Sequence, residues 1–134
     1  LIDFHSRHKL LFMAHSPKLY KEMGSFVADF KQLSRNELIE AYQRLLHQAI
    51  QEKASVKKHI NVLQHLLGYF KNDLTADEKQ EFLDLVEAYR QGDVPLIVPV
   101  TLVNHFVRKY QEPYLGRQYY LNPHPGELRL RNHA

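Results

Sequence analysis

The sequence contains no cysteine and no tryptophan, and only five of its 134 residues are glycine. Without cysteine, the chain can form no disulfide, ligate no zinc or iron–sulfur cluster through sulfur, and use no thiolate nucleophile. No apolar run approaches the roughly 20 residues that a membrane-spanning helix needs, and no signal peptide is visible. These absences favour a cytoplasmic protein with no membrane segment.

Catalytic and metal-binding motifs are also missing. The chain has no glycine-rich phosphate loop, and none of its serines stands in a recognised nucleophile motif. His5 and His8 have the spacing to share one cation, but Asp3 is the only carboxylate near them and a structural zinc needs four close ligands. We therefore expect no catalytic residues, no metal and no cofactor in this chain.

Helical periodicity recurs along the whole sequence, so the expected fold is all-α: a compact bundle of about six helices with an irregular C-terminal strap. The length suits one domain spanning residues 1–134, and the initial Leu1 suggests a piece of a longer polypeptide. Pro95 and Pro99 predict a buried extended link before the sixth helix. The expected helices lie within residues 1–16, 17–30, 34–49, 55–71, 75–92 and 99–110, with a helical turn near 114–120.

Histidines occupy the apolar stripe of the first expected helix. His8 and His15 fall in line with Phe4 and Leu11 at helical spacing, so both should be mostly buried. An imidazole that faces a core must be hydrogen-bonded, either as an ordinary core residue or as part of a polar pocket. The side chains expected to point toward solvent or a partner are His5, Arg7 and Lys9.

A second polar face runs along the fourth expected helix. Asn61, His65 and Tyr69 are spaced at four-residue intervals, beside Gly68, a helix-interior glycine that predicts close approach by another helix or a ligand. Two interpretations remain open: helix packing with an Asn–His hydrogen bond, or a functional pocket between helices 1 and 4. The predicted pocket residues are His8, His15, Asn61 and His65.

The net charge of +3 is unevenly distributed. Residues 71–94 carry seven acidic side chains against three basic ones, whereas residues 53–71 contain four lysines and no acid. A basic surface with tyrosines suits RNA, because bases stack on rings while cations pair with phosphates. The alternative is a C-terminal tail whose tyrosines cover the helical bundle and whose arginines face solvent. The predicted contacts are Arg7, Lys9, Lys57, Lys58, Lys71, Arg108, Arg117, Arg129, Arg131, Tyr114 and Tyr120.

Four sequence blocks resemble the YbgA-like family (domain of unknown function 1722). They are FHSRHKLLFMAHS at 4–16, NVLQHLLGYFK at 61–71, YRQGDVPLIVP at 89–99, and the segment 113–132, which opens with PYL and ends with LRLRN. In that family the domain stands alone or follows an iron–sulfur desulfidase domain that acts on thiolated pyrimidines. The resemblance implies 4-thiouridine in tRNA as the substrate of the fused proteins, with this domain as the part that holds the RNA.

Three functions follow as hypotheses. The first is a tRNA-binding domain that presents RNA to a fused or separate desulfidase. The second is a protein-interaction or oligomerisation module. A large apolar patch on the surface would support it. The third is a small-ligand pocket at the histidines of helices 1 and 4.

Overall fold

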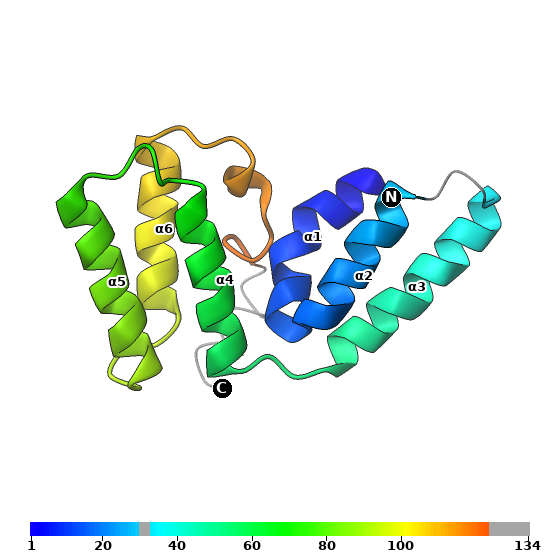
Figure 1. The fold of residues 1–134 in the computed structure, drawn as a ribbon, viewed down its shortest axis with the longest axis horizontal. Helices are drawn as coiled ribbons and strands as arrows, with labels where there is room; N and C mark the ends of the chain where they lie inside the picture. The colour runs from blue at the N-terminus through cyan, green and yellow to red at the C-terminus, as the bar shows by residue number, and fades with distance from the viewer. Residues whose placement is uncertain (30–32, 124–134) are drawn as a thin grey trace.

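The structure, a computed structural model, describes residues 1–29 and 33–123. Within the described residues the fold is all-α, as expected, and contains no strand. The chain runs through the six helices and one short 3-10 helix that Figure 1 shows. Their bounds are α1 Ile2–His15, α2 Pro17–Ala28, α3 Arg35–Gln51, α4 Val56–Gly68, α5 Ala76–Arg90, α6 Ile97–Lys109 and η1 Leu115–Arg117.

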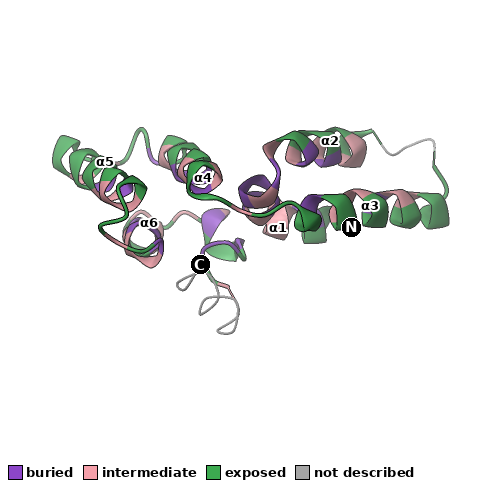
Figure 2. Ribbon diagram, turned by 90° about the horizontal axis from the view of Figure 1, so that it is seen from below, coloured by how far each residue is buried: buried purple, intermediate pink, exposed green. Residues whose placement is uncertain are grey.

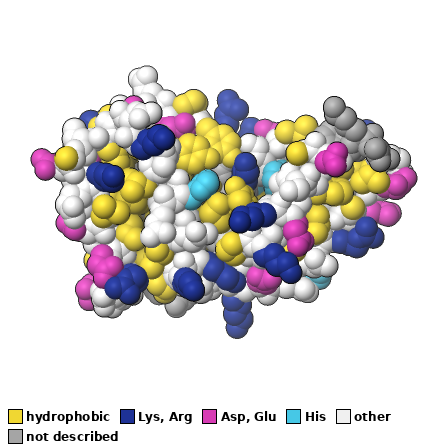
Figure 3. Space-filling model, viewed as in Figure 1, with side chains coloured by type: hydrophobic (Ala, Val, Ile, Leu, Met, Phe, Trp, Pro, Cys, Tyr) yellow, Lys and Arg dark blue, Asp and Glu magenta, His cyan; other side chains and the backbone are white. Residues whose placement is uncertain are grey.

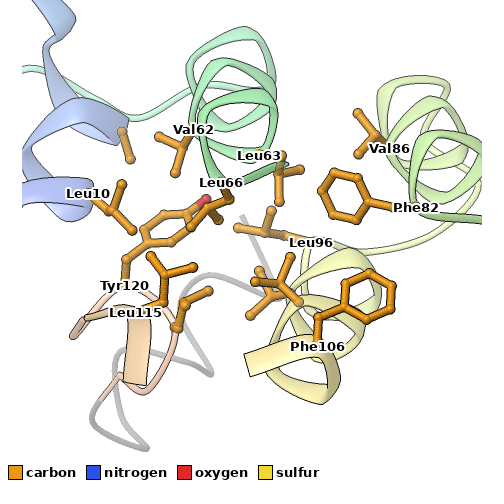
Figure 4. Packing of buried hydrophobic residues seen from close by; sticks show 14 of the residues in the cluster. Leu10, Val62, Leu63, Leu66, Phe82, Val86, Leu96, Phe106, Leu115 and Tyr120 are labelled. Carbon is orange, nitrogen blue, oxygen red and sulfur yellow. The ribbon is translucent and has the colours of Figure 1, made fainter. Parts of the chain in front are cut away.

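Helices α1 and α4 lie side by side in the middle of the molecule. Helices α2 and α3 pack beyond α1, whereas α5 and α6 pack beyond α4, at the opposite end (Figures 1 and 2). Two hydrophobic clusters result, and α1 contributes to both. Its Leu10 and Met13 belong to the cluster that also includes residues of α4, α5 and α6, where Figure 4 shows Leu10 beside Tyr120, while its Phe12 packs with α2 and α3.

Local sequence signals set most helix ends. The hydroxyl groups at the helix starts each accept a hydrogen bond from the backbone N–H three residues later. Helix α5 ends at Arg90, and Gly92 shortly after it has a φ of 82°, which only glycine adopts easily; the backbone N–H groups of Gly92 and Asp93 donate to the carbonyls of Tyr89 and Ala88. The capping residues are Ser16, Ser34, Ser55 and Thr75.

Two expectations about helix ends and spacing are wrong. The link before α6 is not extended throughout, because α6 begins at Ile97 and takes Pro99 into its first turn. A proline is tolerated there, since the first N–H groups of a helix have no partner within it. Gly68 does not mark a close approach of another helix: a Cβ added there would meet nothing within 4 Å among the described residues.

The segment after α6 is attached to α1 through Gln118. Its side-chain oxygen accepts from the backbone N–H of Leu10 (3.3 Å), and its side-chain nitrogen donates to the carbonyl oxygen of Ser6 (2.5 Å). In an undisturbed helix these two backbone groups would bond to each other, so the amide of Gln118 is inserted into the helical ladder. Such an insertion bends a helix, and Figure 1 shows α1 bent between its two halves.

No helix in the described part of the chain is long and apolar enough to cross a membrane. The predicted C-terminal strap, including Arg129 and Arg131, lies outside the described residues.

Candidate nucleic-acid interface

The two histidines of the predicted stripe are mostly buried, as expected, although neither is completely enclosed in the core. His8 and His15 are both partly exposed, and their Nδ1 atoms donate to the carbonyl oxygens of Phe4 (2.7 Å) and Glu52 (2.8 Å). Helix α1 packs on two sides, against α4 and against α2 and α3, so its fully buried positions do not form a single stripe and these two imidazoles lie at the edge of the core.

The other two predicted pocket residues, Asn61 and His65, are exposed on α4. The polar pocket between α1 and α4 therefore stays a prediction. Burial, and then the nearby Lys9, lower the pKa of His65, which keeps this imidazole neutral at physiological pH.

His5, which was expected to face solvent or a partner, is instead 95% buried, with only 5% of its surface exposed. Its Nδ1 lies 3.1 Å from the hydroxyl oxygen of Tyr42, while its Nε2 is buried without a hydrogen-bond partner among the described residues. Burial is the main reason why the pKa of His5 is lowered, and the positive charge of Lys9 and the neighbouring His8 lower it further.

The lowered pKa of His5 predicts a loss of stability in acid. Protonation favours the unfolded state, where the pKa is near 6.5, so stability should fall as the pH drops below about 6.5. Thermal unfolding of wild type and His5→Leu at about pH 7 and about pH 5 measures this effect. We expect a smaller acid-induced drop in the variant; an equal drop would show that His5 is not responsible.

Two tyrosines form a stacked pair where α4 ends. The rings of Tyr69 and Tyr114 are 5.6 Å apart and nearly parallel, at 15°, and His65 contacts Tyr69 edge-on. Burial, with the nearby Tyr114 and Tyr20, raises the pKa of Tyr69 to about 12, so its hydroxyl stays protonated. Tyr69 is nevertheless 36% exposed, which leaves part of the pair open to a ligand.

An open depression with a volume of about 610 Å³ lies beside this pair. Helices α1 and α2 form two of its sides, and the two tyrosines form another. We call it the ring depression; its lining residues are Ile2, His5, Ser6, Lys9, Gly24, Val27, Ala28, Tyr69 and Tyr114.

A second, smaller depression of about 270 Å³ adjoins the first, because Ser6 and Tyr114 line both. It contains two arginines, Arg7 and Arg117. We call it the arginine depression; its lining residues are Asp3, Ser6, Arg7, Pro113, Tyr114, Arg117 and Gln118. Arg7 Nε pairs with the exposed Asp3 carboxylate at 3.0 Å, whereas Arg117 has no ion pair within the described segments.

A second stack of rings lies beyond the arginines. Tyr119 stacks on His8 with ring centres 4.4 Å apart, and His8 stacks in turn on Phe4 at 4.1 Å. Tyr119 is 43% exposed, and its backbone N–H donates to the carbonyl oxygen of Arg7 (3.0 Å). The Gln118 attachment thus places one exposed ring next to the arginine depression.

Two of the predicted RNA contacts have structural roles instead. Tyr120 is fully buried and points into the core, where its hydroxyl oxygen lies 2.7 Å from Nδ1 of His59 (Figure 4). Lys58 donates to the carbonyl oxygens of His15 (2.7 Å) and Lys53 (2.8 Å), which ties the start of α4 to the end of α1. Tyr120 is closed off from a ligand, and the ammonium group of Lys58, which also lies 3.7 Å from the Glu52 carboxylate, is held by these contacts.

The other predicted cations are distributed around the molecule. Lys9 and Arg7 are partly exposed and lie in the two depressions, together with the exposed Arg117. The acidic α5 lies beyond α4, away from α1 (Figure 1). Figure 3 shows basic, histidine and hydrophobic side chains next to one another over the middle of one face. The remaining exposed cations of the predicted set are Lys57, Lys71 and Arg108.

The described residues contain no group of three or more histidine, aspartate or glutamate side chains that could hold a metal ion. His5 and His8, the two histidines with ligand-like spacing, each use Nδ1 in a different contact. The features that remain are stacked rings, two adjacent depressions and cations.

Fold and site together define a small helical domain with aromatic and cationic side chains around two joined depressions. The family model described as a protein of unknown function, DUF1722, matches residues 9–125. The chain is also 34% identical over 133 residues to the uncharacterized protein YbgA of Escherichia coli, an alignment that covers 98% of this chain and 79% of that protein. No solved structure matches. The chain therefore belongs to the DUF1722 family, and neither description assigns an activity.

Proposed function

We propose that this domain binds RNA through the two depressions and the rings beside them. The observation that carries the proposal is a depression that holds two arginines, Arg7 and Arg117, and contacts both ring stacks, one through Tyr114 and the other through the Tyr119 backbone bond to Arg7. Aromatic rings accept unpaired bases by stacking, and guanidinium groups pair with phosphate oxygens. This combination suits a strand in which bases and phosphates alternate.

The RNA in this proposal is tRNA. The basis is the family resemblance, which implies that the domain holds thiolated tRNA for a desulfidase domain, either fused to it or separate. The domain would then contribute affinity and orientation, and the iron–sulfur chemistry would take place in the desulfidase.

Exposed apolar side chains on α3 favour a second candidate, a protein-interaction module. Helix α3 packs against α1 and α2 on one side, while Ile39 and Ile50 are 39% and 49% exposed and share a face at a spacing of eleven residues. A partner helix could cover this face without touching the depressions.

A salt series tests the RNA proposal. Fluorescence anisotropy of labelled tRNA should show binding that weakens steeply as salt rises, because each neutralised phosphate releases counterions. A matched DNA duplex should bind more weakly, since its bases are paired and it has no 2′-hydroxyl groups. Absence of tRNA binding at low salt, or equal affinity for the DNA duplex, would contradict the proposal and favour the interaction module.

A further inference from the structure

We propose that the ring depression receives one unpaired nucleotide of the bound RNA, with the base against Tyr69 and Tyr114 and the phosphate in the arginine depression. This inference rests on the proposed function, since it states which unit of the RNA is recognised and where. The ligand chemistry is that of a nucleotide: a flat ring joined to an anion.

The size and lining of the ring depression suit a flat ring. Its volume of about 610 Å³ falls within the range of roughly 300–1,000 Å³ that is typical of small-molecule sites. Ile2 and Val27 provide apolar surface, and the two tyrosines provide stacking surface. The ring of a base can therefore be covered on its faces while its polar edge meets α1.

Helix α1 forms one side of the ring depression, and this side carries polar groups that face the polar edge of the base. Lys9 and Ser6 both line the depression and can donate hydrogen bonds to the oxygen atoms of a base. His5 lines it too, and its buried Nε2 has no hydrogen-bond partner among the residues that the structure describes. A buried polar atom without a partner is costly in a stable fold, and a ligand that reached it after a small shift would remove that cost.

The arginine depression lies next to the ring depression, and this arrangement favours a nucleotide as the ligand over an aromatic ring without a phosphate. Ser6 and Tyr114 line both spaces, so the two lie on either side of the same residues, and a nucleotide lying across these residues would place its base in one space and its phosphate in the other. Arg117 offers an unpaired guanidinium within the described structure, and Arg7 can exchange the exposed carboxylate of Asp3 for a phosphate. A phosphate accepts the forked hydrogen bonds of arginine well.

Gly24 keeps the ring depression open on the side of α2. It lines the depression within a regular helix, and a Cβ built on it meets nothing within 4 Å. A leucine at this position would therefore extend into open space without disturbing the fold. Gly68, also helical and with nothing within 4 Å, lies outside the ring depression and provides a matched control.

The experiment titrates uridine 5′-monophosphate and ribose 5-phosphate into the full chain and follows the NMR signals of Ser6, Lys9 and Tyr114. Wild type and Gly68→Leu should show saturable shifts with the nucleotide, and at least about tenfold weaker binding of the sugar phosphate, which lacks the base. Gly24→Leu should lose nucleotide binding, and the smaller Gly24→Ala should weaken it. Thermal unfolding of each variant checks that it folds.

The outcomes separate the inference from the proposed function. If Gly24→Leu binds the nucleotide as wild type does, or if the sugar phosphate binds equally well, the nucleotide site is wrong, whereas tRNA binding can still stand. If the nucleotide binds as expected but tRNA does not, the proposed RNA function is wrong. If the nucleotide site and the RNA function are both correct, Gly24→Leu should weaken tRNA binding several-fold. The salt dependence of binding should not change, because no cation is removed.

Discussion

Replacing Gln118 with leucine is expected to lower the free energy of unfolding by about 2–3 kcal/mol. The side chain is almost completely buried and bonds to backbone groups of both Leu10 and Ser6. A leucine of similar size would cover these groups without bonding to them, and each buried polar group left without a partner costs about 1–3 kcal/mol. Part of that cost is recovered if α1 straightens and the two groups bond to each other.

Urea unfolding measures this effect, with Gln64→Leu as the control. Gln64 is an exposed glutamine on α4, so its replacement should change stability by no more than about 0.5 kcal/mol. The Gln118 variant should also expose the backbone N–H of Tyr119 to faster hydrogen exchange, since that group bonds to Arg7 only while the segment lies on α1. Equal unfolding midpoints for the two variants would contradict the role assigned to Gln118.

Removing two cations from the depressions should have the largest effect on RNA binding. We expect Lys9→Ala together with Arg117→Ala to weaken tRNA binding roughly 30-fold at about 0.1 M salt and to reduce the salt slope by about 1.5 to 2 units. Each positive charge lost from the site removes the release of about one counterion, whether the side chain meets a phosphate, as Arg117 does in this proposal, or the edge of a base, as Lys9 does. Anisotropy across a salt series measures both quantities.

The matched control removes two exposed cations elsewhere, through Arg44→Ala on α3 and Lys79→Ala on α5. The net charge changes by the same amount, so a purely nonspecific attraction would weaken equally in both double variants. If the control loses as much affinity as the Lys9 and Arg117 variant, binding is not centred on the depressions.

The helices could be predicted from the sequence because their signals are local. Ser34, Ser55 and Thr75 each cap a helix through an N–H only three residues away, and Gly92 ends α5 through its own backbone conformation. Such signals act within one or two turns, so they do not depend on how the helices pack. The start of α6 was misjudged because a proline is as acceptable in the first turn of a helix as before it.

The site could be predicted only in part, because it depends on contacts between distant segments. Lys9, Arg7, Arg117 and Tyr114 were predicted from charge and aromatic content, and they do meet. Periodicity could not show that α1 is covered on two sides, which is why His5 is more completely buried than His8.

No pattern in the neighbouring sequence predicts that Lys58 binds backbone carbonyls or that Tyr120 lies in the core. Gln118 and Gly24 gave no signal either, since an isolated glutamine or a helical glycine is common in any sequence.

RNA binding at the two adjacent depressions is tested most directly by mapping where tRNA contacts the chain. Backbone amide NMR signals of the uniformly labelled protein, followed during a tRNA titration, report every contacted segment at once. If RNA binds there, the largest changes in the amide signals occur at Ser6, Lys9, Tyr69, Arg117 and Tyr119, and the signals of α5 do not change. Changes centred on Ile39 and Ile50 of α3, or on α5, would contradict it.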